Sequence, residues 1–150
     1  PLIRFDLGPD DNVVFGYPEE YLIKICDSEG NILRHITREY EPIALTQEEK
    51  DAVKIRAPIQ DYTYDIPQAH CAYHQITVDD QGWIFVATWE KPDKGYYYDV
   101  FAPDGKYIAK VGLLFPPVIM KKNKLYAIEL DEEGYEVIRR YEYSISFSGQ

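Results

Sequence analysis

Short apolar runs separated by turn-forming residues recur along the chain and predict β-strands. The clearest example is VDDQGWIFVATW at residues 78–89, followed by YYYDVFAPDGKYIAKV at residues 96–111. The runs are rich in β-branched and aromatic residues, which favour strands. The turns between them carry Gly, which tolerates the positive φ that hairpin turns need. Antiparallel hairpins are therefore predicted, with strands at residues 2–7, 13–17, 21–26, 32–36, 74–78, 83–89, 96–101, 107–111, 124–130 and 135–143.

This succession of runs and turns repeats along the chain. The segment QGWIF at 81–85 aligns with KNKLY at 122–126, a shift of 41 residues. Gly30 aligns with Gly105 at a shift of 75, which is one repeat of 41 plus an extra segment of 34. Strand-rich repeats of about 40 residues are typical of β-propeller blades. The predicted fold class is all-β, a partial β-propeller of about three four-stranded antiparallel meanders with one short inserted helix. Blade-like units are expected at about 1–45, 66–115 and 116–150, with the insertion at about 46–65.

The extra segment contains the predicted helix. Thr46 is followed three residues later by Glu49, which is the pattern of a capping box, and a short helix is expected at residues 46–54. In repeat folds, segments that exceed the repeat emerge as loops on one face, and that face often binds ligands. The alternative is a lid that only covers a sheet edge.

Composition and charge narrow the classes of function. The chain has 150 residues, 45% of them hydrophobic, so it can bury the core of one domain. The net charge is −10 and no stripe of Lys and Arg offsets it, which argues against nucleic-acid binding. No apolar run reaches the length of a membrane span. Cys26 and Cys71 have neither metal-site nor disulfide-scaffold spacing and are expected to be free, largely buried thiols, although a bridge between them stays open.

The strand phrases also resemble a known family. The segments at residues 15–53, 76–88, 98–111 and 122–143 are similar to the C-terminal half of bacterial six-bladed β-propeller proteins related to NHL-repeat propellers. The resemblance implies the architecture and, because members are commonly exported or lipid-anchored, an extracytoplasmic location. The chain holds just under three repeats and begins at Pro1 inside a strand-like run, which favours a fragment or processed product. Either further blades precede it or two copies pair to make six, since an open array leaves sheet edges unpaired.

Motifs of known chemistry are absent from the sequence. There is no GxSxG, no HExxH and no Gly-rich phosphate loop, so no catalytic residue is predicted. His70, Cys71 and His74 suggest a metal site, but four residues of extended chain span about 13 Å, too far for the two histidines to share one ion. We therefore expect no metal and no cofactor. The acidic turns at 27–30, 79–80 and 131–133 lack the ligand spacing of a calcium loop and are expected to be solvated.

Aromatic residues give the remaining candidates for a site. Tyr62 and Tyr64 share one face of an extended strand inside the inserted segment, and with His70 and His74 they are the predicted ligand contacts. The cluster at residues 96–98 is expected to pack between blades instead.

Two functions follow from these residues. The first is a non-catalytic binding or interaction module that takes an unknown protein, peptide or glycan on the insertion-bearing face or in the central channel. The alternative is a lactonase-like propeller hydrolase or lyase whose channel metal is completed by residues from missing blades. Self-association through open blade edges is a further expectation.

Overall fold

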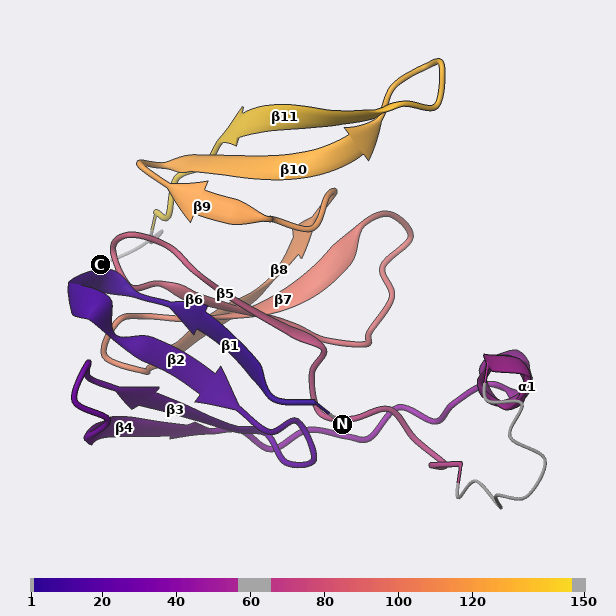
Figure 1. Ribbon diagram of the computed structural model, residues 1–150, viewed down its shortest axis with the longest axis horizontal. Coiled ribbons are helices and arrows are strands. Elements are labelled where there is room, and N and C mark those ends of the chain that lie inside the picture. Colours follow the sequence, from indigo (N-terminus) through magenta and orange to yellow (C-terminus); the bar gives the residue numbers. More distant parts are fainter. Residues whose placement is uncertain (1, 57–65, 147–150) are drawn as a thin grey trace.

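The computed structural model describes residues 2–56 and 66–146, apart from the side chains of residues 54–56, and is mostly β (Figure 1). Its strands form three antiparallel sheets in this part of the chain. The first sheet contains β1 (Arg4–Leu7), β2 (Val13–Gly16), β3 (Leu22–Cys26) and β4 (Ile32–Thr37) in that order. The second contains β5 (Gln75–Val78), β6 (Ile84–Ala87), β7 (Tyr96–Phe101) and β8 (Tyr107–Leu113). The third contains β9 (Ile119–Lys121), β10 (Lys124–Leu130) and β11 (Glu136–Glu142).

The three sheets meet along their first strands. β1 lies against β5, and β5 lies against β9. In the view of Figure 1 the second sheet lies between the other two, with the first sheet below it and the third sheet above it. The described strands form an open array that does not close into a ring, and the third sheet has three strands where four were expected. The prediction of antiparallel meanders with one short α-helix is therefore confirmed at this coarser level.

The two sequence alignments relate equivalent hairpins of successive sheets. The shift of 41 residues places the β5–β6 turn on the β9–β10 turn, and the shift of 75 places the β3–β4 turn on the β7–β8 turn. The predicted strands correspond to β1–β8, β10 and β11, with ends that differ by a few residues. β9 was not predicted, because three residues after a Pro-Pro pair give too short a pattern to recognise.

The acidic hairpin turns share one local structure. In each, an Asp side chain accepts hydrogen bonds from the backbone N–H groups two and four residues later, an Asx-type turn that leads into a Gly with positive φ. The three residues are Asp27, Asp79 and Asp131. The expectation of a solvated carboxylate is wrong for Asp79, which is 1% exposed and also accepts a hydrogen bond of 2.7 Å from the Tyr143 hydroxyl. Folding the third sheet against the second buries it.

Two apolar cores lie between the sheets, one on each side of the second sheet. Ile84 and Val86 of β6 belong to the cluster shared with the first sheet, whereas Phe85 and Ala87 belong to the cluster shared with the third. Both faces of β6 are therefore buried, which explains its continuous apolar run in place of an alternating pattern. Tyr98 is buried in the second cluster, as predicted, but Tyr96 is 42% exposed at the start of β7.

The inserted segment begins with the predicted helix, α1 (Gln47–Arg56). The capping box is confirmed: the Glu49 amide donates to Thr46 Oγ1 at 3.2 Å, and the Thr46 amide donates to Glu49 Oε2 at 2.9 Å. Figure 1 shows α1 projecting beyond the strand ends and not lying over a sheet edge. A backbone pairing between Ala44 and Ala69 ties the two arms of the segment together.

The cysteines are both free, with Cys26 buried and Cys71 only half-buried. Within residues 2–56 and 66–146, no helix combines the length and apolar character needed to cross a membrane.

Candidate functional site

A cleft of about 620 Å³ opens where one end of the first two sheets meets the inserted segment. Its volume falls within the range of small-ligand sites, roughly 300–1,000 Å³. Three groups of residues line it: those just before β3 and after β4, those before β5, and those just after β6 together with one residue from the middle of β7 and one from the middle of β8. The lining residues are Tyr21, Arg38, Glu39, Tyr40, Glu41, Ile43, Cys71, Ala72, Thr88, Trp89, Glu90, Asp99 and Lys110.

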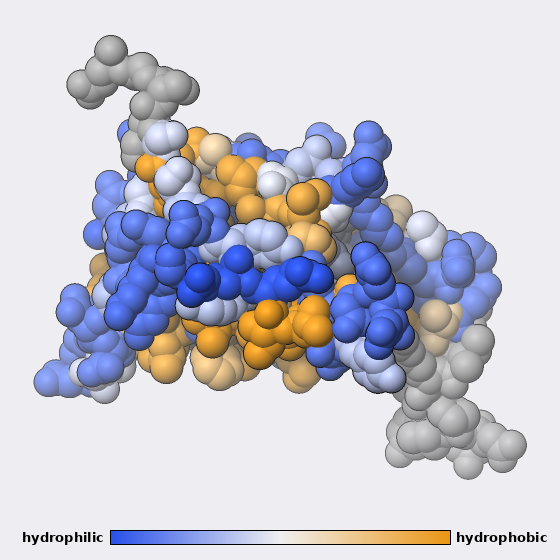
Figure 2. Space-filling model, turned by 90° about the horizontal axis from the view of Figure 1, so that it is seen from above, coloured by the Kyte–Doolittle hydropathy of each residue, from blue (hydrophilic) through white to orange (hydrophobic). Residues whose placement is uncertain are grey.

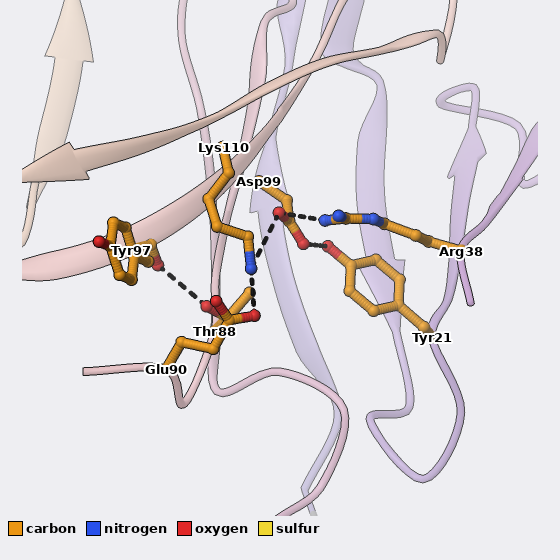
Figure 3. A network of polar contacts seen from close by, with 7 residues as sticks. All are labelled: Tyr21, Arg38, Thr88, Glu90, Tyr97, Asp99 and Lys110. Carbon is orange, nitrogen blue, oxygen red and sulfur yellow. Dashed lines mark hydrogen bonds and ion pairs between the residues drawn. The ribbon is translucent and has the colours of Figure 1, made fainter. Parts of the chain in front are cut away.

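Asp99 is the centre of the polar network at the floor of the cleft (Figure 3). Its side chain is 1% exposed, although it lies on β7 between apolar neighbours. Oδ2 accepts a hydrogen bond of 2.8 Å from the Tyr21 hydroxyl, and Oδ1 forms an ion pair with Arg38 Nη1. Burial of a carboxylate is costly unless it is paired, so this network couples the first sheet to the second.

Lys110 extends the network toward solvent. Its ammonium group lies 3.8 Å from Asp99 Oδ1 and forms a closer ion pair with the Glu90 carboxylate. The Arg38 guanidinium also stacks over the Tyr107 ring, with its central carbon 4.2 Å from the ring centroid. Arg38 and Lys110, the two cations of the cleft, each pair with a carboxylate. Glu39 and Glu41 form no ion pair with another described residue.

Burial and pairing fix the protonation states of Tyr21 and Arg38 at the floor of the cleft. Burial, followed by the charge of Asp99, raises the pKa of Tyr21 far above its ordinary value, so its hydroxyl stays protonated. Burial alone would lower the pKa of Arg38, but the hydrogen bond and charge of Asp99 outweigh it and raise that pKa. Tyr21 and Arg38 therefore keep their protons near neutral pH.

Trp89 forms the aromatic wall of the cleft. The His70 ring stacks on its indole at a centroid distance of 4.1 Å and an interplanar angle of 17°, and His74 approaches at 4.7 Å with a tilt of 54°. The indole Nε1–H is buried and has no hydrogen-bond acceptor among the described residues. Glu49 of α1 lies 3.3 Å from His70 Nε2, which connects the helix to this wall.

Two ionisable groups near Trp89 have shifted pKa values. Burial lowers the pKa of His74, so its imidazole is neutral at pH 7. The backbone hydrogen bond from Thr46, followed by the nearby His70 and Lys91, lowers the pKa of Glu49. The wall thus combines the neutral His74 ring with the half-buried Glu49 carboxylate beside His70.

Two of the four predicted contacts, His70 and His74, lie beside the cleft and pack on its Trp89, but neither is among the residues that line the cleft. His70 and His74 both contact Trp89. The distance between two histidines on an extended chain excluded a shared metal ion, but it does not exclude a shared contact with a larger indole ring. Tyr62 and Tyr64 lie outside the described residues. Among the residues that are described, no group of three or more His, Cys, Asp and Glu is arranged to hold a metal ion.

Sequence reasoning missed the floor of the cleft. Asp99, Arg38, Lys110 and Trp89 lie in or beside strands, where side chains were expected to pack between sheets. One signal was present: Asp99 is a charged residue inside the run YYYDVF, and its neighbours are buried. A charge at a buried strand position requires a partner, but the sequence does not reveal which one.

Comparison with known proteins assigns no family. No protein-family model matches the sequence, and a search of curated proteins gives no match. The fold and the cleft thus define the class only as a β-rich protein of antiparallel meanders with a polar, aromatic-walled cleft at one strand end.

Proposed function

We propose that this chain is a non-catalytic binding module whose ligand docks in the cleft between Trp89 and Asp99. The observation that carries the proposal is the cleft itself, which lies where the inserted segment returns to the sheets. Function commonly resides in loops placed on a rigid scaffold, and here the scaffold consists of two packed sheets.

The state of the ionisable groups supports binding over catalysis. General acid–base chemistry needs a group that exchanges its proton near the working pH. Tyr21 stays protonated, Arg38 stays charged, and both oxygens of Asp99 already have partners. These groups are suited to orient a ligand by hydrogen bonds that do not change with pH near neutrality.

The mixed lining suits a neutral ligand with many hydrogen-bonding groups, a glycan or a peptide. Trp89 and the 37% exposed ring of Tyr40 provide aromatic surface. Both carboxylates and cations line the cleft, so a strongly charged ligand of either sign would meet groups of its own charge. Aromatic rings that contact an apolar face, with polar groups that contact hydroxyls or amides, are the usual means of recognising such ligands.

We further propose that the three sheets are consecutive blades of a six-bladed, NHL-like β-propeller from a bacterium, with an extracytoplasmic location. The support is the order of strands within each sheet and the contact of successive first strands. On this proposal the cleft opens at one end of the blades, on the side that bears α1.

Titration calorimetry with a panel of neutral oligosaccharides and uncharged peptides tests the binding proposal. A hit should bind Trp89→Ala roughly fivefold more weakly, because one aromatic contact is worth on the order of 1 kcal/mol. Tyr135→Ala is the matched control, since Tyr135 is 67% exposed in the β10–β11 turn away from the cleft. Binding that is equally strong in Trp89→Ala contradicts the site.

The alternative, a lactonase-like metal hydrolase, is tested by incubating the chain with lactones and divalent cations. Cation-dependent turnover that Asp99→Asn abolishes would favour the hydrolase and overturn the non-catalytic proposal.

A further inference from the structure

The two outer sheets each leave one apolar face uncovered. On the third sheet, Ile119, Ile128, Leu130 and Ile138 share the face turned away from the second sheet and are 49–76% exposed. On the first sheet, Phe5 and Leu7 are each 63% exposed on the face opposite the core, beside the half-buried Val13 and Phe15. We call these the third-sheet face and the first-sheet face. Charged residues share the third-sheet face with these apolar side chains, namely Lys124, Glu136, Arg140 and Glu142. Exposed apolar groups of this size are often sites of protein contact.

Each sheet has one face suited to the preceding sheet and another suited to the following sheet. The uncovered faces at the two ends of the stack are therefore not equivalent. Ile84 and Val86 of β6 face the preceding sheet, and the shift of 41 residues places them on Leu125 and Ala127 of β10, which also face the preceding sheet. Phe85 and Ala87 face the following sheet, and the same shift places them on Tyr126 and Ile128, part of the uncovered third-sheet face.

The third-sheet face is therefore the surface that each sheet uses to receive the next one. The first-sheet face is the reverse surface. Val14 of β2 packs toward the second sheet, whereas Val13 and Phe15 on either side of it point the other way, as residues facing a preceding sheet would. Two sheet-to-sheet contacts of this kind occur within one molecule. The two uncovered faces correspond to the two surfaces that form each of these contacts.

The size of the faces decides between an open chain of copies and a closed pair. β10 and β11 have seven residues each and β9 has three, so at about 3.3 Å per residue and about 4.8 Å between strands the third-sheet face covers on the order of 270 Å². A stable interface takes about 800 Å² from each partner. One face alone falls well short of this, and covering both faces brings the buried area closer to it. Head-to-tail contacts that do not close would also produce fibres.

We propose that a second copy of this chain covers both faces at once, so that two copies form a closed ring of six sheets with two-fold symmetry. Each third-sheet face meets the first-sheet face of the partner. Figure 2, seen from the side of the third sheet, shows apolar surface on both sides of a hydrophilic band. The contact uses sheet faces and not the sheet edges that the sequence suggested, and it is independent of the proposed ligand cleft.

The net charge gives the dimer a distinctive salt dependence. Each copy carries a charge of −10, so two copies repel at low ionic strength. Added salt screens this repulsion and also favours apolar burial. The dissociation constant should therefore fall as salt is raised from about 0.05 M to about 0.5 M, the opposite of an interface held by ion pairs.

Sedimentation velocity tests the proposal by comparing species of 17.5 kDa with species of twice that mass. The wild-type chain should be dimeric at about 100 µM, and Ile138→Glu and Leu7→Glu should each weaken dimerisation at least roughly tenfold. Tyr135→Glu introduces the same charge at an exposed aromatic residue outside both faces and should have no such effect. Circular dichroism checks that each variant is folded, which is expected because the substituted side chains are exposed.

Three results would overturn the proposal. The first is a folded wild-type monomer at about 100 µM in 0.5 M salt. The second is a series of polymers larger than the dimer. The third is a dimer that tolerates both Ile138→Glu and Leu7→Glu, since its contact would then lie elsewhere.

Discussion

Tyr21 and Asp99 are 78 residues apart in the sequence, and the Tyr21 hydroxyl donates a buried hydrogen bond of 2.8 Å to the Asp99 carboxylate. One residue precedes the third strand of the first sheet and the other lies on the third strand of the second sheet. Together with Arg38, the pair connects the first two sheets, which are also joined by apolar contacts and by a hydrogen bond of 2.8 Å from the Val78 amide to Asp6 Oδ2. The same pair forms the floor of the cleft, so the stability of the sheet packing and the shape of the proposed site depend on one network.

We expect Asp99→Asn to lower the free energy of unfolding by about 2 kcal/mol, because it removes the buried carboxylate that pairs with the half-buried Arg38. Urea unfolding followed by circular dichroism measures the change. Tyr40→Phe is the control, since Tyr40 contacts Tyr21 through its ring and is 37% exposed. A double-mutant cycle with Tyr21→Phe should show coupling, and strictly additive effects would mean that the hydrogen bond is not formed.

A second prediction concerns pH. Burial lowers the pKa of His74 in the folded state below the unfolded value of about 6.5, so the unfolded chain binds the proton more tightly. The stability contribution of the neutral imidazole is complete above the unfolded pKa and is lost as pH falls from about 6.5 toward the folded value. Unfolding free energies measured from about pH 7.5 to 5.5 should decline, with a slope from this group of at most about 1.4 kcal/mol per pH unit.

His74→Gln should flatten that decline. His35→Gln should leave it unchanged, because His35 is exposed on the edge strand β4. Asp27 and Glu49, whose pKa values are lowered, act in a separate window below about pH 4.5, where their carboxylates begin to protonate. If His74→Gln left the pH profile unchanged, the lowered pKa of His74 could not be the cause of the decline in stability.

A third prediction compares two turns of the same local structure. Asp79→Ala should cost about 2–3 kcal/mol, because it removes the acceptor of two backbone amides and of the Tyr143 hydroxyl in a buried place. Asp27→Ala removes two equivalent backbone hydrogen bonds at an exposed turn, where water replaces them, and should cost clearly less. Thermal melts of the two variants measure the difference. Equal losses would show that burial of Asp79 contributes nothing beyond the turn.

Much of the fold could be predicted from local sequence. The strands, the Gly turns and the capping box of Thr46 and Glu49 depend on residues within a few positions of one another, and all of them are present. The repeat alignment also held, because equivalent hairpins carry equivalent turn residues. β9 was not predicted, because three residues leave too little pattern. The burial of Asp79 was not predicted, because the residue that covers it, Tyr143, is 64 positions away.

The site depended on tertiary structure to a greater degree. The sequence by itself determined where strands and turns form and that His70 and His74 lie near the end of an inserted segment. Only the packing of the sheets brought both histidines against Trp89 and placed Arg38 beside Asp99. The physical reason is that turn and strand preferences arise from short-range backbone sterics and hydrogen bonds. The partner of a buried charge is instead selected by which distant strands share a core, and no local pattern encodes that choice.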